Sequence, residues 1–170
     1  MKERILTSLL TVFVISGIQA QAPSPVPKLV VGLTIDQLRA DYIEAFSALY
    51  GERGFKRLLK EGRIYTNAEY DFINVDRSSA TASIYTGTTP YYNGIPSNRW
   101  MDRGSLRIIK SVDDQDFMGV YTSESSSAKL LRCSTLSDEL KVATQGRAEV
   151  YSIAPTREMA ILAAGHAANG

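Results

Sequence analysis

The run from Lys28 to Ile35 constrains the fold more than any other part of the chain, because its side chains are almost all aliphatic. Such a run predicts a strand covered on both faces, as in the middle of a parallel sheet, and therefore an α/β fold. Asp36 follows directly, at the edge where open α/β sheets place their ligands. Asp36 also precedes a helix-like stretch, residues 37–49, whose free amide hydrogens its carboxylate would accept as an N-cap. Its position leaves both roles open.

The rest of the sequence alternates between helix-like and strand-like stretches, as an α/β fold requires. Hydrophobic spacing and turn residues predict helices over residues 55–62, 79–86 and 135–143, and strands over 63–72 and 149–154. Residues 87–94 are predicted to form a turn region. Residues 100–130 are polar and irregular, and we expect them to form a surface insertion. The folded part is predicted to run from residue 28 to residue 170.

Charge and composition exclude several classes of protein. The chain has 19 Lys and Arg residues against 18 Asp and Glu, so it lacks the basic excess that binding to nucleic acid requires. A single cysteine rules out an internal disulfide framework. A single histidine rules out a His-rich zinc site within the chain, so metal binding would need carboxylates or ligands from elsewhere.

The N-terminus is typical of a signal peptide over residues 1–22. Lys2 and Arg4 precede a charge-free apolar run over residues 5–18, and Ala20-Gln21-Ala22 supplies a small-x-small cleavage pattern. The run is short for a transmembrane helix, although a short membrane anchor is the alternative. We therefore expect a periplasmic or secreted protein with no stable membrane insertion after cleavage. The proline-rich residues 23–27 would form a stiff spacer.

Several motifs together resemble the alkaline phosphatase superfamily, in particular its exported threonine-nucleophile phosphatases and their nucleotide pyrophosphatase/phosphodiesterase relatives. They are residues 33–39 (LTIDQLR), 54–58 (GFKRL), 82–90 (ASIYTGTTP), Gly94-Ile95 with Asn98 and Trp100, and 160–162 (AIL) with Gly165-His166. Members of that family are two to three times longer. The resemblance therefore implies an alkaline-phosphatase-like, largely parallel sheet flanked by helices, of which this chain holds the N-terminal portion.

The resemblance implies a hydrolase of phosphate monoesters or diesters that uses two zinc ions. Asp36 matches the first metal-ligating aspartate of the family, and the remaining ligands are not in this chain. Asn98 matches an asparagine that hydrogen-bonds a phosphoryl oxygen, a task suited to an uncharged amide donor. As an alternative, Asn98 is a turn residue after Pro96-Ser97. The expected partner is a phosphoester or an inorganic anion.

Three positions depart from the family pattern, and all three face the substrate in the family. Arg77 stands where the family has its nucleophilic threonine, and a guanidinium cannot attack phosphorus. Ser78 is the alternative nucleophile, although a shift of one residue along a helix turns the side chain by about 100°. Thr156 and Glu158 stand where the family has a Lys-x-Arg pair that holds the substrate.

Two hypotheses follow. In the first, the protein is a metal-dependent phosphoester hydrolase with altered substrate contacts, and this chain alone is inactive. In the second, it is a pseudoenzyme that binds an anion or a partner on the same fold. Arg77 would then pair with Asp36 in place of zinc, or would hold an anion together with Asn98 and the amides of Ser78 and Ser79. His166 is expected to have a structural hydrogen-bonding role.

Overall fold

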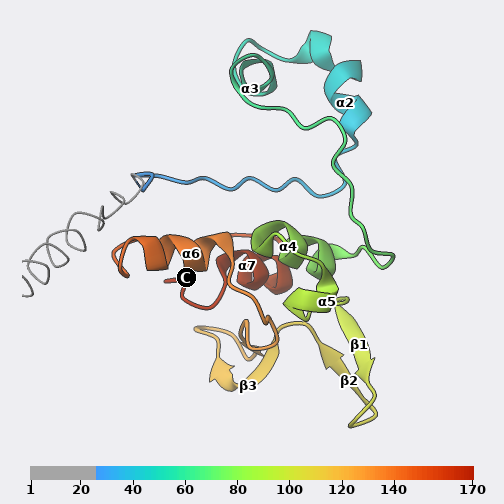
Figure 1. Ribbon diagram of the computed structural model, residues 1–170, viewed down its shortest axis with the longest axis vertical. Helices are drawn as coiled ribbons and strands as arrows, with labels where there is room; N and C mark the ends of the chain where they lie inside the picture. The colour runs from blue at the N-terminus through green and yellow to red at the C-terminus, as the bar shows by residue number, and fades with distance from the viewer. Residues whose placement is uncertain (1–25) are drawn as a thin grey trace, which may run out of the picture. The chain divides into compact units, whose positions relative to one another are not determined.

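The computed structural model describes residues 26–170 (Figure 1). The chain divides into two units, residues 1–30 and 31–170. In the first unit only residues 26–30 are described, and they are exposed and form neither helix nor strand. The predicted signal peptide over residues 1–22 and the first part of the predicted spacer lie outside the described residues. Among the described helices none is long and apolar enough to cross a membrane.

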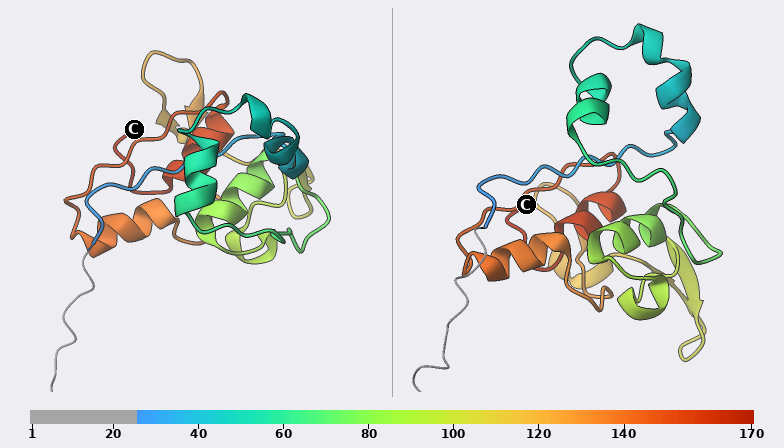
Figure 2. Two further views of the ribbon diagram at one scale, coloured as in Figure 1. Left: turned by 90° about the horizontal axis from the view of Figure 1, so that it is seen from above. Right: turned by 45° about the horizontal axis from the view of Figure 1, so that its top comes forward.

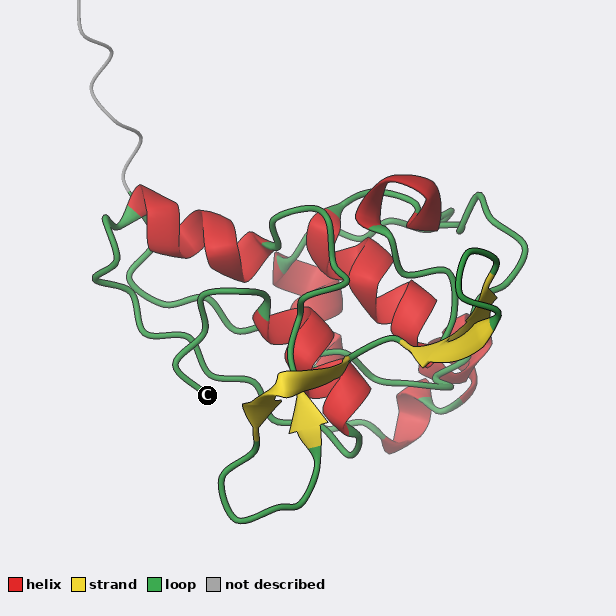
Figure 3. Ribbon diagram, turned by 90° about the horizontal axis from the view of Figure 1, so that it is seen from below, coloured by secondary structure: helices red, strands yellow, loops and turns green. Residues whose placement is uncertain are grey.

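The second unit consists of short helices and two small sheets (Figures 2 and 3). The helices are α2 (Ala40–Ala45), the 3-10 helix η1 (Ser47–Leu49), α3 (Phe55–Glu61), α4 (Arg77–Thr86), α5 (Pro90–Asn93), α6 (Leu136–Ala143) and α7 (Arg157–Ala164). Strands β1 (Arg99–Asp102) and β2 (Arg107–Lys110) pair antiparallel, with Trp100 opposite Ile109. Strands β3 (Asp113–Met118) and β4 (Ser125–Ser126) also pair antiparallel.

The helix predictions are largely confirmed. Helix α3 ends at its C-cap Gly62, and α6 follows the N-cap Thr135, as the sequence predicts. Helix α4 begins two residues earlier than expected, at Arg77, because the Asp76 side chain caps it. The predicted helix over 37–49 is wrong in its extent: it is broken into α2 and η1. Arg39 is the N-cap of α2, so the N-cap role considered for Asp36 is wrong.

The predicted strands over residues 28–35, 63–72 and 149–154 are wrong, since none of them is paired in the described part of the chain. A strand requires a continuous ladder of backbone hydrogen bonds with a neighbour. Within residues 26–170 the stretches 28–35 and 63–72 have no such neighbour, and 149–154 shares only isolated backbone hydrogen bonds with Asn169 and Gly170. Many of their apolar side chains remain in solvent, as Leu33 (78% exposed) and Ile153 (98%) do, although Val150 is buried. The α/β fold class is confirmed, with antiparallel pairs as the sheets described here.

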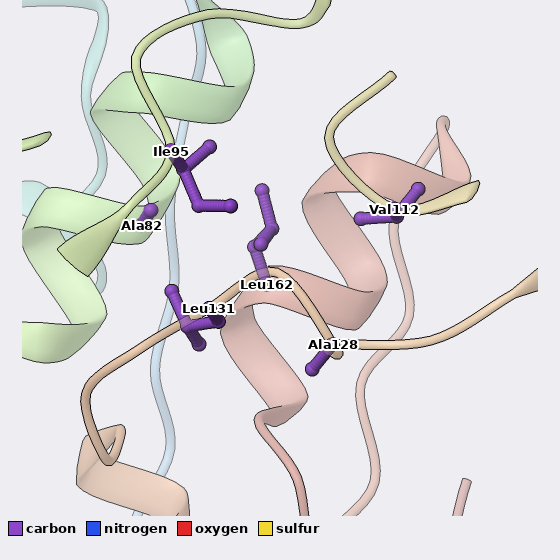
Figure 4. Close-up of a cluster of buried hydrophobic side chains, with 6 residues drawn as sticks. All are labelled: Ala82, Ile95, Val112, Ala128, Leu131 and Leu162. Atoms are coloured by element: carbon purple, nitrogen blue, oxygen red, sulfur yellow. The ribbon is translucent and has the colours of Figure 1, made fainter. Parts of the chain in front are cut away.

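A small hydrophobic core joins α4 and α7 to the loop before β1 and to the segments that follow β2 and β4 (Figure 4). Leu162 of α7 and Ile95 are completely buried. The core consists of Ala82, Ile95, Val112, Ala128, Leu131 and Leu162. The stretch 100–130 is not irregular, because it contains most of β1 and all of β2, β3 and β4. Its residues Val112 and Ala128 pack into the core, whereas Leu106 and Tyr121 are exposed.

Candidate functional site

The predicted site residues gather at the first turn of α4, where Asp76 is the N-cap. The amide of Ser79 donates to Oδ1 of Asp76 at 3.0 Å, and the amide of Asp76 donates to Oγ of Ser79 at 2.9 Å. This reciprocal capping box satisfies amide groups that a helix start otherwise leaves unpaired. It also fixes the point at which the chain turns into α4, and therefore the place of Arg77.

The second carboxylate oxygen of Asp76 ties α4 to the loop before β1. Oδ2 accepts from the hydroxyl of Ser97 at 2.7 Å and from the amide of Asn98 at 2.6 Å. Partial burial by itself raises the pKa of Asp76, but the hydrogen bonds from Ser79, Asn98 and Ser97 outweigh it and hold the pKa below its usual range. Asp76 is thus a charged carboxylate with both oxygens in use.

Arg77 forms an ion pair with Asp36. Its Nε donates to Oδ2 of Asp36 at 2.9 Å, and the two side chains are 50% and 44% exposed. The pairing considered from the sequence is therefore present. Within residues 26–170, no hydrogen bond engages the two terminal nitrogens of Arg77, whose side chain is half exposed, so these donors are available to a ligand. A half-exposed pair of this kind stabilises a fold by at most about 1 kcal/mol.

The segment that carries Asp36 is also held to α4 by a tyrosine. The hydroxyls of Thr34 and Tyr85 lie 3.2 Å apart, and a Cβ at Gly32 would come within 3.0 Å of the Tyr85 hydroxyl. Tyr70 lies near the same carboxylate: burial raises its pKa, and the negative charge of Asp36 raises it further.

Ser78 is not presented as a nucleophile, so the structure corrects that prediction. The residue is completely buried, and its Oγ lies 2.8 Å from Oγ of Ser111. Ser79 is equally buried, and its hydroxyl donates to the carbonyl of Asn74 at 2.8 Å. Both serines lie on the buried face of the first turn of α4, so their hydroxyls point into the protein.

The amides at the start of α4 are also occupied. The Ser78 amide donates to Oδ1 of Asn98 at 3.0 Å, and the Ser79 amide donates to Asp76. An anion therefore cannot use these two amides without displacing protein groups, and the predicted anion cradle that includes them is wrong for this conformation. What remains for a ligand is the outward part of Arg77 and the side-chain amide of Asn98.

Asn98 is exposed, and its side-chain orientation is set by α4. Because a backbone N–H must face an acceptor, the Ser78 amide fixes Oδ1 of Asn98 toward the helix. Nδ2 then points away from the Ser78 amide, and it has no hydrogen-bond partner among residues 26–170. Its predicted contact with a phosphoryl oxygen stays a prediction, while the alternative of a purely local turn residue does not account for the bond to α4.

The other substituted positions lie at the start of α7. Thr156 is the N-cap, and its hydroxyl is buried with no hydrogen-bond partner in the described part of the chain. Glu158 lies 3.5 Å from Nε of Arg157. Arg157 itself is paired with Asp113 and Glu124. The guanidinium of Arg157 is therefore paired with carboxylates of the β3–β4 hairpin. Among the hydrogen bonds of the described residues, none links Thr156, Arg157 or Glu158 to Arg77 or Asn98.

His166 has the structural role expected of it. Its Nδ1 lies 3.0 Å from Oδ2 of Asp138, and its Nε2 lies 3.0 Å from the carbonyl of Leu131. Both ring nitrogens face acceptors, so the imidazolium form satisfies both contacts. Burial by itself lowers the pKa of His166, but the hydrogen bonds to Asp138 and Leu131 and the charge of Asp138 raise it overall.

The described residues do not fit a metal site. Within residues 26–170 there is no group of three or more His, Cys, Asp or Glu side chains arranged to hold a metal ion. Asp36, the predicted zinc ligand, already has the guanidinium of Arg77 as its cationic partner. A zinc site needs three or four protein donors, so Asp36 alone cannot form one.

Sequence reasoning missed Asp76 and Ser111. The spacing of Asp76 and Ser79 is that of a capping box, which would have moved the predicted start of α4 to Arg77. Nothing in the sequence indicated Ser111, because its contact with Ser78 joins residues 33 positions apart.

Comparison with known proteins shows the family to which this fold and these residues belong. The chain belongs to the type I phosphodiesterase / nucleotide pyrophosphatase family, whose model matches residues 30–155. Among similar proteins is the alkaline phosphatase PhoV of Synechococcus elongatus, 42% identical over 147 residues, which are 85% of this chain and 27% of PhoV. The alkaline phosphatase PafA of Elizabethkingia meningoseptica is 35% identical over 169 residues, which are 95% of this chain and 31% of PafA.

The alkaline-phosphatase-like fold is confirmed by solved structures. The crystal structure of wild-type PafA matches with a TM-score of 0.79 and 34% identity, over 84% of this chain and 28% of that one. The chain thus spans less than a third of the length of these relatives.

Proposed function

We propose that the protein containing this chain binds a phosphate ester or a similar oxyanion without hydrolysing it. The observation that carries this proposal is the ion pair between Arg77 and Asp36. The residue at the family's nucleophile position is a cation that cannot attack phosphorus, and the carboxylate at the family's metal position already has a cationic partner. The buried Ser78 offers no replacement.

Binding is supported by the donors that remain. The terminal nitrogens of Arg77 form the planar fork that matches a phosphoryl group, and Asn98, which is bonded to the amide of the adjacent Ser78, adds an uncharged side-chain donor. The carboxylate of Asp36 pairs with this single guanidinium, so the pair has no net positive charge to attract a second negative charge on the ligand. We therefore expect a monoanion, such as a phosphate diester, to bind more tightly than a dianionic monoester.

The test uses the full-length mature protein, with zinc content measured on the purified sample. Hydrolysis of an aryl phosphate and an aryl phosphodiester should not exceed the buffer rate, and zinc should be absent. Equilibrium titration with a dialkyl phosphate and with inorganic phosphate should detect binding. Arg77→Ala should weaken it by about 10-fold or more, as expected for loss of charged hydrogen bonds worth about 1.5–3 kcal/mol.

A matched control is Arg57→Ala. Arg57 is an exposed arginine that pairs with Glu61 at 2.9 Å within α3, so the substitution also removes one charge and one surface ion pair. It should leave binding unchanged. Equal weakening by both substitutions would show that only net charge matters and would contradict the proposed site.

The second candidate is a metal-dependent phosphoester hydrolase, which family membership and the presence of Asp36 and Asn98 favour. It predicts bound zinc and turnover that is lost on removal of the metal. Turnover that survives Ser78→Ala would still support this candidate and would place the nucleophile elsewhere in the protein. Either result would overturn the non-hydrolytic proposal. Export rests in both cases on the predicted signal peptide.

A further inference from the structure

The carboxylate of Asp76 joins the start of α4 to the loop that carries Ser97 and Asn98. Oδ1 accepts from Ser79 inside α4, while Oδ2 accepts from Ser97 and from the amide of Asn98, 22 residues along the chain. The two oxygens thus have separate tasks: one caps the helix, and the other holds the loop that carries Asn98.

The loop is closed by a second bond in the opposite direction. The Ser78 amide donates to Oδ1 of Asn98 at 3.0 Å, while the Asn98 amide donates to Asp76 at 2.6 Å. Asn98 is therefore held by its backbone and by its side-chain oxygen at once. Its Nδ2 donor points away from the Ser78 amide and has no hydrogen-bond partner among residues 26–170.

We propose that Asp76 is a positioning residue that presents Nδ2 of Asn98 to an oxyanion beside Arg77. The proposal rests on the proposed oxyanion-binding function and assigns a residue that touches no ligand itself. Asp76 acts through Asn98: without the bond to the Asn98 amide, the backbone of Asn98 keeps the bond that its carbonyl accepts from the Ser111 amide at 2.9 Å, and the bond between its Oδ1 and the Ser78 amide loses its support on the Asp76 side.

Asp76→Asn separates the two tasks of the carboxylate. Asn caps helices as well as Asp does, so its one oxygen can keep the bond from the Ser79 amide. Its other side-chain atom is an amide nitrogen, which cannot accept from the Asn98 amide. The variant should therefore retain α4 and release the loop. Asp76→Ala removes both tasks and serves as the fully disrupted reference.

The control is Asp138→Asn in the capping box of α6. Asp138 is also a carboxylate that accepts several hydrogen bonds, from the Thr135 amide at 2.9 Å and from the His166 amide at 2.8 Å. No hydrogen bond connects it to Arg77 or Asn98 within residues 26–170. Asp138→Asn should lower the unfolding midpoint without altering oxyanion binding.

The experiment combines two measurements on the full-length mature protein. Amide hydrogen exchange should accelerate by about 10-fold or more at Ser78 and Asn98 in Asp76→Asn, and not in Asp138→Asn. Titration with a dialkyl phosphate should show about 10-fold weaker binding in Asp76→Asn. In Asn98→Ala, the further substitution Asp76→Asn should add almost nothing, because both changes remove the same donor.

The outcomes separate this proposal from the proposed function. If the wild-type protein binds no oxyanion, the proposed function fails, and the exchange rates still decide whether Asp76 holds Asn98. Unchanged exchange at Ser78 and Asn98 in Asp76→Asn would overturn the positioning role. A lower unfolding midpoint with unchanged affinity, or fully additive effects of Asp76→Asn and Asn98→Ala, would reduce Asp76 to a structural cap and would also overturn it.

Discussion

Substitution of Gly165 by alanine should destabilise the protein strongly, because the new methyl group would enter a buried cluster of hydrogen bonds. Gly165 has φ +80° and ψ −156°, a conformation that is essentially restricted to glycine. A Cβ there would lie 2.3 Å from Oγ1 of Thr135 and 2.6 Å from Oδ2 of Asp138. Both atoms belong to the capping box of α6, which therefore has to open.

The magnitude follows from two contributions. The backbone conformation costs about 1–3 kcal/mol for a residue with a Cβ. Loss of a hydrogen bond to the Asp138 carboxylate costs about 1.5–3 kcal/mol more. Gly165→Ala should thus lower the free energy of unfolding by about 2.5–6 kcal/mol, and few single substitutions reach the upper part of this range.

Gly146→Ala is the matched control. Gly146 has the same φ of +80°, but a Cβ there would have no atom within 4 Å. It should cost only the backbone contribution, about 1–2 kcal/mol. Urea denaturation of the full-length mature protein and both variants measures the difference, which should be about 1.5–4 kcal/mol. If the two variants agree within about 0.5 kcal/mol, the contact with the α6 capping box has no energetic role and the reasoning is refuted.

Three further predictions concern charged and buried groups. The pKa of His166 is raised above its ordinary value of 6.5, so the stability that the protonated ring provides is complete below pH 6.5 and is lost as the pH rises through the folded-state pKa. The urea midpoint of His166→Gln should therefore lack this fall with rising pH. Ser78→Ala leaves the hydroxyl of Ser111 without its partner, and should lower the free energy of unfolding by about 1–3 kcal/mol without creating or removing hydrolysis. Asp36→Asn should lower it by less than about 1 kcal/mol, because the pair with Arg77 is half exposed; a larger loss in calorimetry would contradict that estimate.

The sequence by itself determined the family, the helices with local signals and the residues that depart from the family pattern. Helices α3 and α6 are predicted from hydrophobic spacing, and the end of α3 from Gly62 at its C-cap, because these signals are contained within a few residues. Arg77 was recognised as a substitution because the motif around residues 82–90 fixes its position. These inferences need no knowledge of distant contacts.

Tertiary structure decided which groups are paired and which are free. Oγ of Ser78 is buried against Ser111, and the Asn98 amide meets Asp76 across 22 residues; neither contact leaves a local signal. The strand prediction over 28–35 is wrong for the same physical reason. Aliphatic side chains indicate that a segment tends to be buried in a sheet, but a strand forms only where a neighbouring backbone supplies its hydrogen bonds.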